Sequence, residues 1–151
     1  KLAALLKENA DEPRAVRLAR AIMQTQQRTP IESTRALADV VRDALDQTDC
    51  DEDEIVLSIR RVFQALRIAV NDEFGALDSL LSQIPHCLRP GGRVAILTFH
   101  SGEDRRVKQA FKAGLAAGVY TSVTDTVIRA TPEEQHSNPR SAPAKLRFAV
   151  R

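Results

Sequence analysis

A single β-prone run at residues 93–99 constrains the fold of this chain more than any other feature. It follows a turn-forming segment, residues 88–92, and precedes a helical pattern at about 103–116. A short, nearly continuous run of this kind is typical of a strand that is buried on both faces of a parallel sheet. Two further strand candidates, 120–128 and 146–150, follow. This order of elements predicts an α/β fold with a doubly wound sheet.

Helical periodicity covers most of the chain before this strand. Residues 13–28 carry a narrow apolar stripe at helical spacing, and Pro30 breaks the pattern. A second amphipathic pattern covers residues 34–45, so the two segments predict a helical hairpin. The longest pattern, residues 59–81, keeps one apolar side, and Gly75 is a candidate for a kink within it.

Residues 46–54 contain six acidic side chains and no basic one. Mutual repulsion in such a segment favours an exposed, mobile loop. The segment lacks the glycine turn and the terminal glutamate of a calcium-binding loop, so we do not expect a metal site there. We therefore expect a helical region at residues 1–57 that ends with an acidic linker at 46–54, and a second domain at residues 58–151.

Charge is distributed unevenly along the chain. Residues 1–54 carry 8 basic and 12 acidic side chains, whereas residues 55–151 carry 14 basic and 8 acidic ones. The basic second half suits a polyanionic partner, but an ordinary mixed-charge surface accounts for it equally well. No apolar run is long enough to span a membrane and no signal-peptide pattern opens the sequence, so we expect a cytoplasmic protein.

The loop that follows the 93–99 strand is the first candidate site. Ligands of open α/β sheets bind at the carboxyl ends of the strands, which is where His100 and Ser101 stand. Residues adjacent in sequence rarely reach the geometry of a nucleophile and its base, and no G-x-S-x-G elbow occurs, so a hydrolase is disfavoured. A structural interpretation makes Ser101 the cap of the next helix, with Glu103 and Asp104 in its first turn.

Residues 61–73 read RVFQALRIAVNDE, and taken alone their polar positions fit a solvated helix face. In order with residues 88–93 (LRPGGR), 99–105 (FHSGEDR) and 138–147 (NPRSAPAKLR), they resemble the bacterial family that methylates N4 of a cytosine in small-subunit ribosomal RNA, called methyltransferase H or MraW. Residues 17–38 look like the inserted helical domain of that family, which is thought to help hold the RNA. The resemblance covers almost the whole chain and about the last half of the family protein.

The chain departs from the family pattern in three places. Gly102 stands where the family usually has leucine, and residues 58–60 stand where a His-Pro-Ala-Thr stretch is usual. A glycine-rich turn between a strand and a helix, which approaches the cofactor in nucleotide-binding folds, is missing. The resemblance implies S-adenosyl-L-methionine as cofactor, but its main binding motifs are absent, so the chain alone should bind it weakly or not at all.

The resemblance implies a partial class I methyltransferase sheet, Rossmann-like and covered by helices, with a helical insertion segment. The catalytic candidates that it implies are Asn71, Glu73, His100 and Ser101, and the candidates for binding the substrate RNA are Arg67, Asp72, Asp104, Arg105, Asn138 and Arg140. Either Glu73 or His100 would accept a hydrogen bond from the target amine. We expect the cluster at residues 67–73 to converge with His100 and Ser101 on one concave site.

The implied partner is small-subunit ribosomal RNA, with no membrane and no metal. The chain is expected either to form a dimer or to lack an N-terminal half. Two alternatives remain open at this point. One is a non-catalytic RNA-binding or structural module with the same fold, and the other, less favoured, is an unrelated α/β hydrolase that uses His100.

Overall fold

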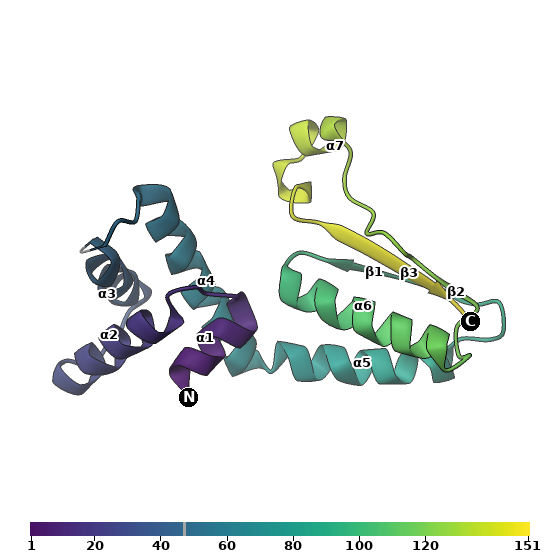
Figure 1. Ribbon diagram of the computed structural model, residues 1–151, viewed down its shortest axis with the longest axis horizontal. Helices are drawn as coiled ribbons and strands as arrows, with labels where there is room; N and C mark the ends of the chain where they lie inside the picture. Colours follow the sequence, from purple (N-terminus) through teal and green to yellow (C-terminus); the bar gives the residue numbers. More distant parts are fainter. Residues whose placement is uncertain (47) are drawn as a thin grey trace. The chain divides into compact units, whose positions relative to one another are not determined.

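The structure is a computed structural model that describes residues 1–46 and 48–151 (Figure 1). Contacts within the chain divide it into two compact units, residues 1–73 and residues 74–151. In the part of the chain that the structure describes, no helix is both long and apolar enough to cross a membrane.

The first unit is helical. Its helices are α1 (Leu2–Ala10), α2 (Ala15–Arg28), α3 (Thr34–Asp46) and α4 (Glu52–Asn71). The predicted hairpin is confirmed as α2 and α3, and the short helix α1 precedes it. The apolar sides of all four helices meet in one core.

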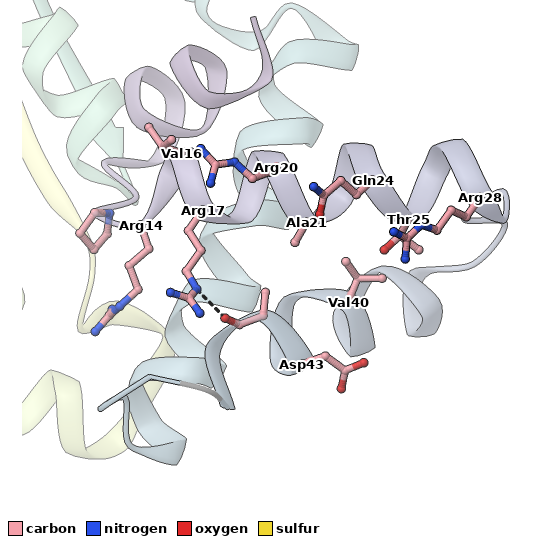
Figure 2. Close-up of a pocket in the computed structure, with 12 residues that line it drawn as sticks. Arg14, Val16, Arg17, Arg20, Ala21, Gln24, Thr25, Arg28, Val40 and Asp43 are labelled. Carbon is pink, nitrogen blue, oxygen red and sulfur yellow. Dashed lines mark hydrogen bonds between the residues drawn. The ribbon is translucent and has the colours of Figure 1, made fainter.

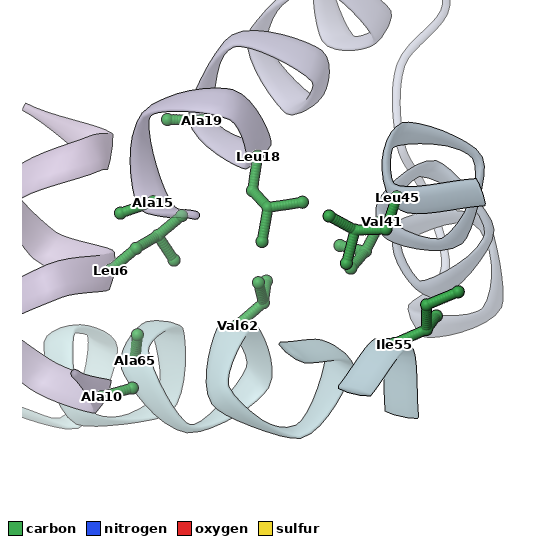
Figure 3. Close-up of a cluster of buried hydrophobic side chains, with 10 residues drawn as sticks. All are labelled: Leu6, Ala10, Ala15, Leu18, Ala19, Val41, Leu45, Ile55, Val62 and Ala65. Carbon is green, nitrogen blue, oxygen red and sulfur yellow. The ribbon is translucent and has the colours of Figure 1, made fainter. Parts of the chain in front are cut away.

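Figure 3 shows this core, in which each helix contributes at least one fully buried aliphatic side chain. Leu6 of α1, Leu18 of α2, Val41 and Leu45 of α3, and Val62 of α4 all have 0% exposure. Burial of each such side chain stabilises the fold by about 1.5–3 kcal/mol. The core therefore holds the arginine-bearing helix α2 in a fixed position against α3 and α4.

The acidic segment is partly helical, which corrects the expectation of a loop. Asp51 is the N-cap of α4, and its side chain accepts a hydrogen bond from the amide of Glu54 at 2.8 Å. Acidic side chains in a first helical turn are stabilised by the positive end of the helix dipole, so repulsion among residues 52–54 is offset. The predicted loop is thus wrong for Asp46, which ends α3, and for residues 52–54, which begin α4, and Gln47, which it also included, lies outside the described residues.

Arginines from the neighbouring helix pair complete this neutralisation. Arg42 of α3 contacts Glu52 at 2.6 Å, and Arg14 contacts Glu54 at 2.9 Å. The hydrogen bond to Glu52 and the charge of that carboxylate raise the pKa of Arg42. The charge pattern alone did not show this compensation because the partners lie 10 and 40 residues away in the sequence.

The long helical pattern is divided at Asp72 and not at Gly75. Asp72 adopts the left-handed conformation (φ 48°, ψ 43°) and ends α4, and α5 (Glu73–Cys87) follows at once. Aspartate is one of the few residues other than glycine that visit this conformation routinely. The predicted boundary after residue 57 falls inside α4, and as a division between an inserted region and a catalytic domain it stays a prediction.

The second unit contains helices on one face of a small sheet. After α5 come β1 (Arg93–Thr98), α6 (Ser101–Ala116), β2 (Ser122–Val123), α7 (Pro132–Ser137), a 3₁₀ turn η1 (Pro139–Ser141) and β3 (Lys145–Val150). Its core joins Leu81 and Ile84 of α5 to Val107 and Phe111 of α6, and to Ala149 of β3. The mixed α/β class is confirmed.

The sheet differs from the predicted one in strand direction. Its order is β1-β3-β2, and β3 pairs with both neighbours in an antiparallel sense, from Arg93 opposite Val150 to Thr98 opposite Lys145. Helices α5 and α6 pack on one face of the sheet, so burial alternates along β1 and Leu97, on the other face, remains 53% exposed. The expectation of a parallel strand buried on both faces is therefore wrong for this chain, because the strand beside β1 returns from the far end of the sequence.

Candidate functional site

The junction between α4 and α5 gathers three of the predicted residues around one carboxylate. Arg67 donates two hydrogen bonds to Glu73, from Nε to Oε1 at 2.7 Å and from Nη2 to Oε2 at 3.0 Å. Asn71 Nδ2 donates to the same Oε1 at 3.4 Å. In an uninterrupted helix, residues six apart project about 120° apart around the axis and lie more than one turn apart. The left-handed turn at Asp72 is therefore what brings Glu73 back to Arg67.

This arrangement fixes the Glu73 carboxylate more than it stabilises the fold. The Arg67 side chain is 58% exposed and that of Glu73 is 26% exposed, and exposed ion pairs contribute about 0–1 kcal/mol. A two-pronged contact with a guanidinium nevertheless restricts the orientation of a carboxylate strongly. The cluster thus holds an acceptor group in a defined direction at the end of a helix.

His100, and not Ser101, is the N-cap of α6. Its Nδ1 accepts the amide N–H of Glu103 at 3.4 Å, and Glu103 Oε2 in return accepts the amides of Phe99 at 2.9 Å and His100 at 3.4 Å. These reciprocal bonds form a capping box. Ser101 is the exposed first residue of the helix, so its expected role as the cap is corrected.

The ring of His100 is held from two further sides within the second unit. Its Nε2 lies 3.3 Å from Glu103 Oε1, and the Phe74 ring lies at a centroid distance of 5.9 Å. The side chain is only 13% exposed. With Nδ1 accepting an amide proton, the imidazole has a fixed orientation at the carboxyl end of β1.

Asp104 and Arg105 follow in α6 and have different surroundings. Both carboxylate oxygens of Asp104 accept from Arg147 of β3, at 2.6 and 3.2 Å, and the side chains are 16% and 7% exposed. This nearly buried ion pair joins α6 to the sheet. Arg105 is exposed on the surface of the helix.

A pocket of about 580 Å³ brings Asn138 and Arg140 next to the end of β1. Phe99, the residue before His100, lines it together with Leu97, and the chain around η1 forms the opposite side. Apolar residues at 128, 144 and 146 complete the wall. The sequence indicated Asn138 and Arg140 but missed the aromatic and aliphatic wall, because Leu97 and Phe99 were expected to be buried in a sheet.

The sequence of this chain matches the sequence model of the MraW methylase family over residues 1–151. The chain belongs to this family. It is 44% identical to ribosomal RNA small subunit methyltransferase H 2 of Alkaliphilus metalliredigens, over 99% of this chain and 44% of that protein. It is also 45% identical to ribosomal RNA small subunit methyltransferase H of Deinococcus deserti, over 99% of this chain and 48% of that protein. The chain thus spans less than half the length of these relatives.

The structure leaves little room for a side chain at Gly102, one of the positions where the sequence departs from the family pattern. A Cβ atom at Gly102 would lie 2.7 Å from Cζ of Phe74 and 3.2 Å from Nδ1 of His100. Phe74 therefore fills the space that a side chain at position 102 would need, and Arg106 Cζ lies over this ring at 4.2 Å from its centroid. The aromatic ring of Phe74, from α5, thus occupies the space beside Gly102.

The departure at residues 58–60 is also accommodated in the first unit. Ser58 is fully buried, and its hydroxyl donates to Oε1 of Glu12 at 3.3 Å. The same oxygen accepts the amide of Arg14 at 2.9 Å, at the start of α2. Ser58 therefore contributes a partner for a buried carboxylate and belongs to the core of the helical unit.

The predicted site residues are thus gathered in two groups, one in each unit. Arg67 and Asn71 both bond to Glu73, and Asn138 and Arg140 share a pocket with the residue that precedes His100. The two units are separate compact bodies. The expected convergence of the two groups on one concave site stays a prediction.

Proposed function

We propose that this chain is the C-terminal part of an S-adenosyl-L-methionine-dependent methyltransferase that modifies N4 of a cytosine in small-subunit ribosomal RNA. The observation that carries this proposal is the family match over the whole chain. Named relatives that share 44–45% identity are ribosomal RNA small subunit methyltransferases, which supports RNA as the substrate. The fixed Glu73 and the oriented His100 are consistent with groups that position a substrate.

We propose that the described residues do not by themselves form the site for the cofactor. The paired glycines Gly91 and Gly92 stand at the amino end of β1, where they exchange backbone hydrogen bonds with Arg151. A cofactor turn would instead follow a strand and open a helix. We propose that the cofactor contacts lie in the part of the family protein that this chain does not span.

Transfer to an exocyclic amine requires that the amine be held in one direction and that it lose a proton. We assign Glu73 as the group that accepts the hydrogen bond from this amine, since its carboxylate is fixed by Arg67 and Asn71. His100 is less suited because its Nδ1 accepts the Glu103 amide in the cap of α6. We assign His100 and Ser101 to the floor of the catalytic pocket that would hold this amine.

The 580 Å³ pocket supports a second part of the proposal, the binding of a nucleotide of the substrate RNA. Phe99 offers an aromatic surface on which an unpaired base stacks, and Arg140 offers a guanidinium for a phosphate. Asn138 lies in the same pocket and supplies an amide for a base edge. Arg105 and Asp72 remain candidates for RNA contacts, whereas the bonds of Asp104 to Arg147 favour a supporting role.

We also propose that β1 and β3 belong to a larger Rossmann-like sheet in the whole protein. Among the described residues, β1 pairs only with β3, so its other edge makes no strand contact. Proteins normally cover or pair such edges.

The test is methyl transfer by a family-length protein, that is, a protein of the relatives' full length that contains this chain. The assay uses labelled S-adenosyl-L-methionine and small ribosomal subunits that lack the modification. We expect N4-methylcytidine on digestion of the RNA. The Glu73→Gln variant should lose most of the transfer rate, whereas Asp78→Asn, an exposed acidic position on the same helix, should keep it. RNA binding without any transfer would favour the non-catalytic alternative, and transfer to another atom would contradict the assignment of N4.

A further inference from the structure

Asp72 sets the direction of the chain at the junction between α4 and α5. Its backbone has φ 48° and ψ 43°, in the left-handed region that residues with a Cβ atom seldom adopt. Its N–H bonds to the carbonyl of Ile68 and ends α4, and α5 begins at the next residue, Glu73. A strained backbone of this kind persists only where its surroundings maintain it, and such residues cluster at functional sites.

The side chain of Asp72 does not itself orient Glu73. Three hydrogen bonds from Arg67 and Asn71 reach the Glu73 carboxylate. The Asp72 carboxylate takes part in none of these three bonds, and the residue is exposed. The contribution of Asp72 to this cluster therefore comes from its backbone conformation.

A right-handed conformation at Asp72 would abolish the cluster. The helix α4 would then continue, and Glu73 would project about 120° away from Arg67 around the axis and more than one turn further along it. The two-pronged contact between the guanidinium and the carboxylate needs both groups on one side of the junction. The direction of the Glu73 carboxylate is thus coupled to a single backbone torsion pair.

We propose that Asp72 is a positioning residue, which aims Glu73 at the target amine through its left-handed backbone and not through its own carboxylate. This inference rests on the proposed function and narrows the role that was left open there for Asp72. Asparagine and glycine adopt the left-handed conformation readily, so either should replace Asp72. Valine should not, because a branched Cβ atom makes this conformation strongly unfavourable.

The region that the family resemblance assigns to holding the RNA is separate from this junction. A groove of about 840 Å³ lies along α2 and α3, and Arg17, Arg20 and Arg28 line it (Figure 2). None of residues 67–73, all of which the structure describes, lines this groove. A change of backbone conformation at Asp72 should therefore alter the rate of transfer and leave the affinity for RNA unchanged.

The experiment compares Asp72→Asn, Asp72→Gly and Asp72→Val in the family-length protein, by single-turnover methyl transfer at saturating RNA. The asparagine and glycine variants should keep the rate within about twofold of the parent. The valine variant should lower it roughly ten- to hundredfold, because a small displacement of a positioning group is enough for such a loss. Asparagine and valine remove the same charge, so equal loss in both variants would assign the role to the carboxylate and overturn the proposal.

Asp11 provides the matched control for strain. It ends α1 with φ 50° and ψ 36°, it is exposed, and it and Asp72 are the two non-glycine residues with positive φ among those that the structure describes. Asp11→Val should lower the urea midpoint of unfolding about as much as Asp72→Val and keep the transfer rate of the folded protein. A similar loss of rate in both valine variants would reduce the effect to general destabilisation and overturn the proposal.

A second measurement, on the 151-residue chain, does not depend on methyl transfer. The NMR signal of the Arg67 Nε–H group reports its bond to Glu73, and Glu73→Ala gives the position of the signal without that bond. The signal should stay in place in Asp72→Asn and Asp72→Gly and move to the Glu73→Ala position in Asp72→Val. An unmoved signal in Asp72→Val would overturn the positioning role. Failure of the parent family-length protein to transfer methyl groups would instead count against the proposed function, and the NMR signal would still decide whether Asp72 positions Glu73.

Discussion

At Gly102 the backbone of α6 approaches the ring of Phe74 so closely that no Cβ atom fits without a shift. The same ring lies beside His100 and under Arg106. The Phe74 ring, which fills the space left open at Gly102, therefore forms part of the surroundings of His100, a candidate site residue. At the residue scale, the identity of the neighbour in space matters more than the identity of the neighbour in sequence.

Gly102→Leu should lower the free energy of unfolding by about 1–3 kcal/mol, because overpacking forces side chains off their rotamers. Combined with Phe74→Ala, which opens space, the same substitution should cost less than it does alone. Urea denaturation of the two single variants and the double variant measures this coupling. Lys108→Leu, at an exposed position of the same helix, controls for the change in side chain. Additive effects would show that Phe74 does not fill the missing volume.

Asn71→Ala in a family-length enzyme should lower the transfer rate more than the stability. Asn71 is exposed and its bond to Glu73 is long at 3.4 Å, so its loss removes little folding energy. It does remove one of the groups that orient the Glu73 carboxylate. Single-turnover rates together with thermal unfolding separate the two effects. Parallel loss of rate and stability would favour a structural role.

At the element scale, α6 is held at its first turn by two kinds of bond. The capping box of His100 and Glu103 satisfies amides at the start of the helix, and Asp104 binds Arg147 of β3. Helix and sheet are thus joined directly behind the loop that carries the candidate catalytic residues. Movement of α6 would displace His100 from the end of β1.

Asp104→Asn should destabilise the second unit by about 3–5 kcal/mol, because it leaves the nearly buried Arg147 without its counter-charge. Asp104→Leu combined with Arg147→Met should cost less, since no buried charge then remains. Denaturant unfolding monitored by circular dichroism measures both. If Asp104→Asn instead weakened RNA binding at unchanged stability, Asp104 would be an RNA contact as the family resemblance implies.

At the scale of the whole molecule, two features support the proposal that the family's cofactor site needs residues outside this chain. They are the exposed face of the sheet and the position of the glycine turn. Leu97 and Phe99 are each 53% exposed, and Gly91 and Gly92 bond to Arg151 at the amino end of β1. The chain spans less than half the length of its relatives. The cofactor site of the family protein is therefore expected to need residues that this chain does not contain.

We expect the chain alone to bind S-adenosyl-L-methionine weakly or not at all in titration calorimetry. A family-length protein should bind it, which serves as the positive control. Micromolar affinity of the isolated chain would contradict this expectation and would require a cofactor site within the two described units.

The sequence by itself determined the features that depend on residues within a few positions of one another. The helical spacing of α2, α3 and α6 and the β-prone run of β1 were predicted within a few residues of their observed ends. The motif at residues 61–73 indicated Arg67, Asn71 and Glu73 together, and Arg67 and Asn71 do both bond to Glu73. Local hydrogen bonding and side-chain periodicity are enough for such features.

Only the tertiary structure decided the features whose partners are distant in sequence. The direction of the sheet follows from β3, which lies about 50 residues beyond β1 and returns antiparallel to it. The partner of Asp104 is 43 residues away, and Phe74 reaches Gly102 from another helix. A pattern of apolar residues shows that a segment is buried but not what covers it. The element that packs against a segment decides the direction of its strands, which side chains fill the space and which buried charges pair. These features therefore became visible only in the tertiary structure.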